Sequence, residues 1–260
     1  MTNTDAFPLI NPALTIDWLK ANATGKGVQV AIIDSGIDSL HPALEHRVVR
    51  TCVVHKNAEG EIICEEIPVE KSVDNFGHGT AVAGCVTDVA PAVEIINIRV
   101  LNEYNACTGD ILIAGLKWAL QQGIRLVNMS LATSKQQWIE SLYQLAEQAY
   151  LQNTIIVASR RNVGDLGCPA MFSSVISVDR ETYTDRYQLG YRANNMIEYD
   201  ARGTEIEVLA PGGGYAIQTG TSFATPHITG MVALLLEKFP KITGPEAKSI
   251  LKALAQEKNN

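Results

Sequence analysis

This 260-residue chain lacks the features that mark several large classes of protein. The longest apolar run near its C-terminus, Ile228 to Leu236, is too short to span a bilayer. The segment from Met1 to Asp17 has no basic stretch followed by an apolar run, so it is not a secretory signal. Pro211-Gly212-Gly213-Gly214 lacks the Gly-Lys-Ser/Thr ending of a phosphate-binding loop and is expected to be a flexible turn. We expect a protein that is neither embedded in a membrane nor exported by that route.

Positive charge is also scarce. The chain has 21 Lys and Arg against 28 Asp and Glu, which gives a net charge of −7. Binding to a nucleic-acid backbone requires clustered cations, and the only such cluster is Arg160-Arg161. The composition therefore argues against nucleic acid as a partner.

Cysteine is present but without paired spacing. The five cysteines are Cys52, Cys64, Cys85, Cys107 and Cys168. An odd number without a zinc-type spacing predicts free thiols in a reducing compartment, and hence a cytoplasmic protein. A bridge between Cys52 and Cys64 across a hairpin is the alternative.

The proportions of hydrophobic and charged residues are those of a globular protein. With 46% hydrophobic and 19% charged residues, the chain can bury one large core without disulfides. No linker, repeat or low-complexity stretch interrupts it, so residues 1–260 are expected to form a single domain. We expect residues 1–27 to be an N-terminal extension without a signal peptide or a full prodomain.

Strand-like and helix-like segments alternate along the chain. The expected strands cover residues 28–33, 94–100, 125–129, 154–158, 175–178 and 205–209, and the expected helices cover residues 78–86, 110–122, 136–152, 222–236 and 246–255. Such alternation predicts an α/β fold, in which helices cover both faces of a predominantly parallel central sheet.

Three separated fragments supply a carboxylate, an imidazole and a hydroxyl. Asp34 follows an apolar strand, at the edge where open α/β sheets bind ligands. His78 opens one small, apolar helical segment, and Ser222 opens another. Taken singly, each has an ordinary structural alternative: a turn-forming acid, a structural histidine and a helix N-cap. Their joint occurrence favours a catalytic triad.

The fragments together resemble the subtilisin-like serine proteases, the subtilases of peptidase family S8, and in particular the intracellular type. The motifs are Asp34-Ser35-Gly36-Ile37-Asp38 followed by His41-Pro42, then His78-Gly79-Thr80, and Gly220-Thr221-Ser222-Phe223-Ala224-Thr225-Pro226-His227. The order Asp, His, Ser is that of subtilisin and differs from chymotrypsin and the α/β-hydrolases. The resemblance covers about Val28 to Leu254 and implies the family's three-layer sandwich.

The resemblance also implies residue roles. Asp34 would orient the imidazole, His78 would act as general base and then general acid, and Ser222 would be the nucleophile. Asn162, which follows the strand at residues 154–158, would donate a hydrogen bond to the oxyanion.

Substrate would bind between two segments that depart from the family pattern. One wall is Ser130, Leu131 and Ala132, where the family often has Gly in the third position; the other is Ser159, Arg160 and Arg161, where the family usually has small residues. An arginine directed into the cleft would favour Asp or Glu near the scissile bond. Alternatively, both arginines pair with acids such as Asp165 or Asp179, or lie in water.

No cofactor or metal is expected. Many secreted relatives hold calcium with an acid soon after His-Pro and with a loop that interrupts the helix beginning at the catalytic His. Here Ala43 follows His41-Pro42, and the helical pattern runs on from His78 to Val86, so the oxygen ligands of that site are missing. Cys168-Pro169 matches a family turn with a cis peptide bond, which we also expect here.

Two regions lie outside the family pattern. Residues 53–73 are acidic and are expected to form an exposed hairpin near His78, and residues 183–202, rich in Tyr and Arg, are expected to form a solvated loop, the alternative for both being substrate recognition. Three functions fit the sequence: a serine endopeptidase acting through an acyl-enzyme, a narrow-specificity processing protease or transpeptidase with the same chemistry, or a non-catalytic peptide-binding domain. The complete set of four catalytic groups argues against the last.

Overall fold

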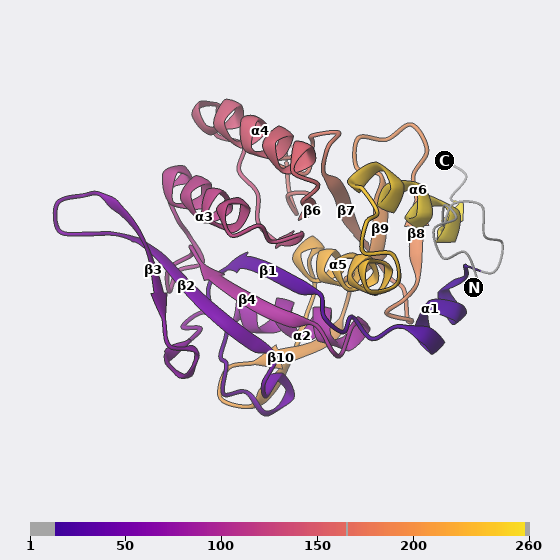
Figure 1. The fold of residues 1–260 in the computed structure, drawn as a ribbon, viewed down its shortest axis with the longest axis horizontal. Coiled ribbons are helices and arrows are strands. Elements are labelled where there is room, and N and C mark those ends of the chain that lie inside the picture. Colours follow the sequence, from indigo (N-terminus) through magenta and orange to yellow (C-terminus); the bar gives the residue numbers. More distant parts are fainter. Residues whose placement is uncertain (1–13, 165, 258–260) are drawn as a thin grey trace.

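The structure is a computed structural model that describes residues 14–164 and 166–257. In that part of the chain, one large sheet is covered by helices on both faces, and a separate two-stranded hairpin lies beside it (Figure 1). The first half of the N-terminal extension, residues 1–13, lies outside the described residues, as does Asp165.

The large sheet is predominantly parallel, as predicted. Over the described residues it has ten strands in the order β12-β8-β9-β7-β6-β5-β1-β4-β2-β3. They are β1 (Gln29–Asp34), β2 (Val48–Lys56), β3 (Ile62–Ile67), β4 (Glu94–Arg99), β5 (Leu126–Met129), β6 (Ile155–Ser159), β7 (Ile176–Glu181), β8 (Leu189–Tyr191), β9 (Tyr199–Arg202) and β12 (Gln256–Glu257). Only the pairs β2–β3 and β8–β9 are antiparallel.

Strand β1 is buried on both faces and divides the sheet. Val30 and Ile32 belong to one hydrophobic core, and Ala31 and Ile33 belong to the other, which is the alternation expected of a strand between two helical layers. Strand β1 pairs in parallel with β4 on one side and with β5 on the other. The order in which the chain adds strands to the sheet therefore reverses at β1. Open α/β sheets bind ligands beyond the carboxyl ends of the strands at such a reversal, and Asp34 ends β1 at this point.

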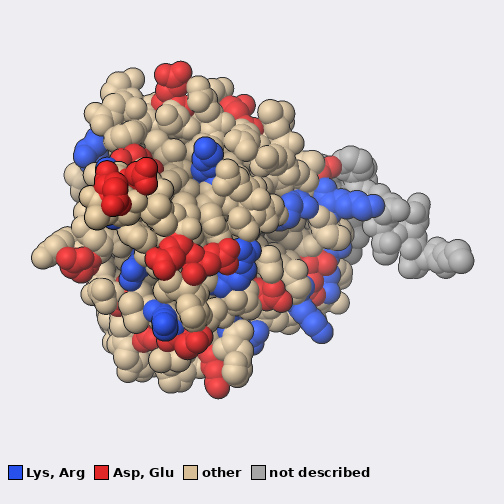
Figure 2. Space-filling model, turned by 60° about the vertical axis from the view of Figure 1, so that its left-hand side comes forward, with Lys and Arg blue, Asp and Glu red and all other residues tan. Residues whose placement is uncertain are grey.

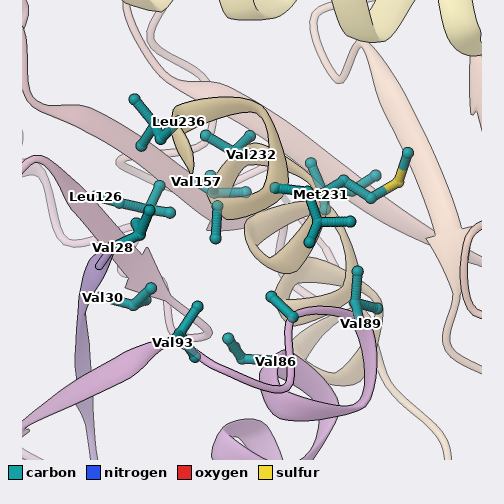
Figure 3. Packing of buried hydrophobic residues seen from close by; sticks show 14 of the residues in the cluster. Val28, Val30, Val86, Val89, Val93, Leu126, Val157, Met231, Val232 and Leu236 are labelled. Atoms are coloured by element: carbon teal, nitrogen blue, oxygen red, sulfur yellow. The ribbon is translucent and has the colours of Figure 1, made fainter. Parts of the chain in front are cut away.

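Helices form the outer layers of the sandwich (Figure 1). The elements packed on the first core are α1 (Ile16–Asn22), α2 (His78–Val89), α5 (Thr221–Lys238) and α6 (Gly244–Leu254), and those on the second are α3 (Gly109–Gln121) and α4 (Gln136–Leu151). Figure 3 shows Met231, Val232 and Leu236 of α5 packed among valines of the neighbouring strands and of α2. Short 3-10 turns occur at Pro42–Leu44 and Val69–Lys71.

The predicted elements agree with the observed ones to within about three residues at their ends, including the helix predicted to open at Ser222, which begins at Thr221. The expectation of a solvated loop at residues 183–202 was wrong, because β8 and β9 form there. Leu189 and Tyr199 are each 1% exposed, and Asp200 is buried in an ion pair with Arg192. Strands of three and four residues with paired internal charges resemble a polar loop in the sequence.

The hairpin expected at residues 53–73 and the turn expected at residues 211–214 both lie in hairpins. The acidic region at residues 53–73 does contain a hairpin, but it begins earlier, at Val48, and its inner strand is largely buried rather than exposed. The glycine-rich turn joins β10 (Ile206–Ala210) to β11 (Gly214–Gln218), and the second of these strands was not predicted. Gly212 and Gly213 have φ values of 81° and 83°, which side chains other than glycine rarely adopt.

Three further expectations concern the thiols, the cis bond and the surface. The Cys168-Pro169 bond is cis, as predicted. All five cysteines are free thiols, including Cys52 and Cys64 on the β2–β3 hairpin. In the described residues no helix has the length and apolar character needed to cross a membrane. Figure 2 shows acidic and basic groups intermixed on the face that it presents, without a basic stripe.

Candidate active site

Asp34 and His78 are joined where a strand end meets a helix start. His78, the first residue of α2, donates from Nδ1 to Oδ1 of Asp34 at 2.7 Å. The Ser35 backbone N–H donates to the same carboxylate oxygen at 2.8 Å. A Cβ at position 79 would lie 2.0 Å from the Gly36 carbonyl oxygen, so only glycine lets α2 begin this close to the strand end. Asp34 is fully buried, and this packing fixes the imidazole beside it.

Asp74 holds the beginning of α2, a role that sequence reasoning missed. Its carboxylate accepts hydrogen bonds from the backbone N–H of Gly77 at 2.7 Å and of Thr80 at 2.9 Å, and from the Ser35 hydroxyl at 2.9 Å. These amides have no partner inside the helix, so a nearby carboxylate satisfies them and favours the positive helix end. The N-cap itself is Gly77, with a φ of 100° and no side chain. An acid three residues before such a glycine was the available signal.

The protonation of His78 is set by competing effects. Burial lowers the pKa of the imidazole, but the Asp34 charge, its hydrogen bond and the Asp74 charge together outweigh burial. The pKa of His78 is therefore raised above its usual value. A histidine tuned in this direction is a stronger base for accepting a proton.

Ser222 and Ser130 exchange two hydrogen bonds. The Ser222 hydroxyl donates to the Ser130 carbonyl oxygen at 3.0 Å, and the Ser130 hydroxyl donates to the Ser222 carbonyl oxygen at 2.8 Å. Pro226, four residues further along α5, has no N–H to offer that carbonyl, so the Ser130 hydroxyl takes its place. In the described structure no hydrogen bond joins Ser222 directly to His78.

A buried polar chain supports Ser130 from behind. Thr229 of α5 donates to the Asn128 side-chain oxygen at 2.8 Å, and the Asn128 amide nitrogen donates to the Ser130 hydroxyl at 3.0 Å. Asn128 and Thr229 are fully buried, where an unpaired polar group is costly. The chain therefore fixes the end of β5 against the start of α5.

Asn162 is held by its oxygen. Oδ1 accepts from the backbone N–H of Thr221 and from Nη1 of Arg180, both at 3.0 Å. Because the oxygen faces two donors, the amide nitrogen Nδ2 is directed the other way and can donate to a ligand. Arg180, at the end of β7, was not identified from the sequence, since nothing local connects it with Asn162.

The predicted site residues lie around one cavity of about 490 Å³. Nine of the ten line it: His78, Ser130, Leu131, Ala132, Ser159, Arg160, Arg161, Asn162 and Ser222. The tenth, Asp34, is buried behind His78. The structure therefore brings together groups that are up to 188 residues apart in the sequence, from Asp34 to Ser222.

The two arginines have different partners. Arg160 forms an ion pair with Asp179, at 3.0 Å between Nη1 and Oδ2, as the structural alternative expected. Arg161 donates from Nη1 to the Ser134 hydroxyl at 3.0 Å. Only Arg160 therefore has a carboxylate partner among the described residues, and the two positions are not equivalent.

The calcium site that the sequence predicts to be missing has few oxygen ligands in the structure. Helix α2 runs without interruption from His78 to Val89, and Ala43 has no ligating group. Across residues 14–164 and 166–257, no three His, Cys, Asp or Glu side chains gather where they could hold a metal. That the protein needs no metal stays a prediction.

Comparisons with known proteins agree on one family. A family model described as the subtilase family matches residues 25–260. The chain is 32% identical to an intracellular serine protease of Paenibacillus polymyxa, over 81% of this chain and 67% of that protein. It is 30% identical to subtilisin DY of Bacillus licheniformis, over 94% and 89%. A crystal structure of a cold-adapted subtilisin-like serine proteinase matches with a TM-score of 0.71 and 26% identity, over 89% of this chain and 83% of the other.

The chain belongs to the subtilase family. It is a subtilisin-type serine endopeptidase, a hydrolase whose substrates are peptides or proteins. The family and the three-layer fold implied by the sequence motifs are thereby confirmed.

Proposed function

We propose that this protein hydrolyses peptide bonds through an acyl-enzyme formed on Ser222, with His78, Asp34 and Asn162 as the other catalytic groups. The observation that carries the proposal is the 2.7 Å hydrogen bond between His78 and Asp34, beside a cavity that His78 shares with Ser222 and Asn162. A base with an orienting acid and a nearby hydroxyl is the arrangement that nucleophilic acyl transfer requires.

The chemistry proceeds in two halves. Ser222 Oγ attacks the scissile carbonyl carbon while His78 Nε2 takes the hydroxyl proton. The tetrahedral intermediate collapses, the C–N bond breaks, and His78 returns the proton to the departing amine. Water then attacks the ester and gives a proton to His78, which passes it back to Ser222 as the carboxylic acid leaves. Asp34 holds Nδ1–H and stabilises the imidazolium in both halves.

The oxyanion is stabilised by two donors in this proposal. One is Nδ2 of Asn162, which is directed away from Thr221 and Arg180 by the contacts of its oxygen. The other is the backbone N–H of Ser222, the second residue of α5, which has no acceptor inside the helix. Donors that are already fixed stabilise developing charge without reorganisation.

The Ser222 hydroxyl must turn before it reacts. In the structure it donates to the Ser130 carbonyl oxygen, so this hydrogen bond has to be given up in favour of His78 before proton transfer. A single hydroxyl hydrogen bond contributes about 1 kcal/mol net, so substrate binding can offset its loss.

Labelling with a fluorophosphonate tests the nucleophile. Wild type should be labelled and should cleave an unstructured protein substrate, whereas folded Ser222→Ala should do neither. Ser249→Ala, which removes an exposed hydroxyl on α6, is the matched control and should retain both. Labelling of Ser222→Ala would refute the assignment. A folded wild type that binds peptide but neither labels nor cleaves would support the non-catalytic alternative.

Hydrolysis and transpeptidation differ only in what attacks the acyl-enzyme. Adding a peptide amine at increasing concentration during cleavage separates them, because a transpeptidase diverts most of the acyl group into a new amide at low amine. We expect hydrolysis to dominate, since the cavity opens to solvent at Asn162, which is exposed.

The proposed location is the cytoplasm. It is supported by the five free thiols, which persist in a reducing compartment, and by the similarity to a protein named intracellular serine protease. Fractionation of the native host with detection of the untagged protein tests this location.

A further inference from the structure

The cavity is positively charged although the protein is not. Three cationic residues line it, Lys135, Arg160 and Arg161, and no Asp or Glu of the described residues does. The whole chain has a net charge of −7, so this concentration of positive charge does not follow from composition. A surface with one sign of charge at the reacting centre favours ligands of the opposite sign.

Arg161 belongs to one wall of the cavity and reaches toward the other. A Cβ at Gly167 would be 2.7 Å from Cγ of Arg161 and 3.0 Å from the Ala132 methyl, so the Arg161 stem and Ala132 pack against the same glycine. The walls are tied together behind it, because Thr133 and Cys168 exchange backbone hydrogen bonds of 3.0 and 2.8 Å. The guanidinium donates to the Ser134 hydroxyl, and among the described residues its other N–H groups have no side-chain acceptor.

The position of Arg161 relative to the reacting carbonyl identifies the substrate residue it meets. Arg161 directly precedes Asn162, whose Nδ2 marks the place of the scissile carbonyl oxygen in the proposed function. The side chain of the residue that supplies this carbonyl, P1, leaves from the adjacent carbon. In the proposed function this side chain enters the same cavity, whose lining includes Leu131, Ala132 and Arg161.

We propose that the protein selects peptides with aspartate or glutamate at P1, and that Arg161 is the residue that binds this carboxylate. The inference rests on the proposed function, because it takes the place of the scissile carbonyl from it. A guanidinium can bind a carboxylate through two parallel hydrogen bonds, which Lys cannot do. Arg160 is not the binding residue, since its guanidinium is already paired with Asp179, which offsets its charge.

The same contacts disfavour a large apolar P1 side chain. Arg161 and Ala132 both line the cavity, and their side chains leave less room for a leucine or phenylalanine than glycine at these positions would. An apolar group placed there would also cover the guanidinium without pairing it, which is costly. Selectivity should therefore arise from attraction of acids and from exclusion of bulky apolar groups together.

A set of fluorogenic peptides that differ only at P1 tests the inference. Wild type should cleave the Glu or Asp peptide with a kcat/KM at least about 10-fold above that of the Leu and Phe peptides. Arg161→Gln should reduce the ratio of Glu to Leu by about 10-fold or more, and Arg161→Lys, which keeps the charge without the planar fork, should fall between them. Lys241→Gln removes an exposed cation that does not line the cavity, and it should keep the wild-type ratio.

Two results would overturn the inference and leave the proposed function intact. One is a wild type that labels with fluorophosphonate but prefers Leu or Phe at P1, as it would if another carboxylate of the chain already neutralised Arg161. The other is an Arg161→Gln variant with an unchanged ratio. Failure of labelling together with failure to cleave every peptide would sink the proposed function instead.

Discussion

The two sides of the active-site cavity are built differently. The catalytic frame, which we define as Asp34, His78 and Ser222, lies at the end of a buried strand and at the starts of two helices. The recognition wall, defined as residues 130–134, 159–164 and 166–168, is largely loop, and several of its side chains are half-buried or exposed. Packing constrains the frame so closely that position 79 accepts only glycine. The wall tolerates two arginines where relatives usually have small residues, so selectivity can change while the chemistry stays fixed.

The largest expected effect comes from removing the acid of the frame. Asp34→Ala should lower kcat on the order of 10⁴-fold, the size known for the equivalent change in subtilisin itself. The residual activity should also shift in pH. Because Asp34 raises the pKa of His78 against burial, its loss should lower that pKa, so the acidic limb of the kcat/KM profile moves to lower pH. An acidic limb at or above the wild-type position would contradict the assigned pairing.

Asn162 lies where frame and wall meet. Asn162→Ala should lower kcat by about 10²–10³-fold, a range taken from subtilisin, and should leave KM little changed because the donor acts on the transition state. The thermal midpoint should stay close to wild type, since the side chain is exposed. A change confined to KM would assign Asn162 to substrate binding and blur the division between the two regions.

His227 tests how the burial of α5, the helix that carries Ser222, affects the stability of the protein at different pH values. The residue is buried in α5, five positions after Ser222, and burial lowers its pKa from 6.5 to about 4. Between about pH 6.5 and pH 4, His227 binds a proton in the unfolded chain but stays neutral in the folded chain. The stabilisation is therefore complete above about pH 6.5 and is lost as pH falls through about 4, amounting to roughly 3 kcal/mol.

Urea unfolding of wild type and His227→Asn at pH 7.5 and pH 4.5 measures this term. The fall in the free energy of unfolding between the two values should be smaller in the variant. Should the variant not fold, the imidazole NMR signals of wild type decide, because His227 should remain neutral at pH 5. Equal pH dependence in both proteins, or protonation at pH 5, would be against the prediction.

The smallest expected effect concerns Arg180, which orients Asn162 from the back of the wall. Arg180→Gln should lower kcat by about 10-fold, less than loss of Asn162 itself, because Thr221 still holds the amide oxygen. Arg180→Lys should restore most of the activity by donating to the same oxygen, and KM should not change. A variant that loses stability but not kcat would reduce Arg180 to a structural contact.

Much of the frame could be predicted because its signals are local. Four consecutive apolar residues, Val30 to Ile33, directly before Asp34 indicate a buried strand, and small residues after His78 and Ser222 indicate closely packed helices. Asp74 was missed because the residue at the N-cap of α2 is a glycine that carries no signal of its own. Arg180 was missed because its contact with Asn162 joins the ends of two neighbouring strands, 18 residues apart.

The sequence by itself determined the order of the central strands and of the helices that cover them, the family and the identity of the four groups proposed for catalysis, because short motifs and hydrophobic periodicity encode them locally. Only the tertiary structure decided that Arg160 pairs with Asp179 while Arg161 faces the cavity, and that residues 189–202 extend the sheet. Neighbouring arginines have the same chemistry, so the acids and walls that surround each one in space, and not its place in the chain, determine what it can bind.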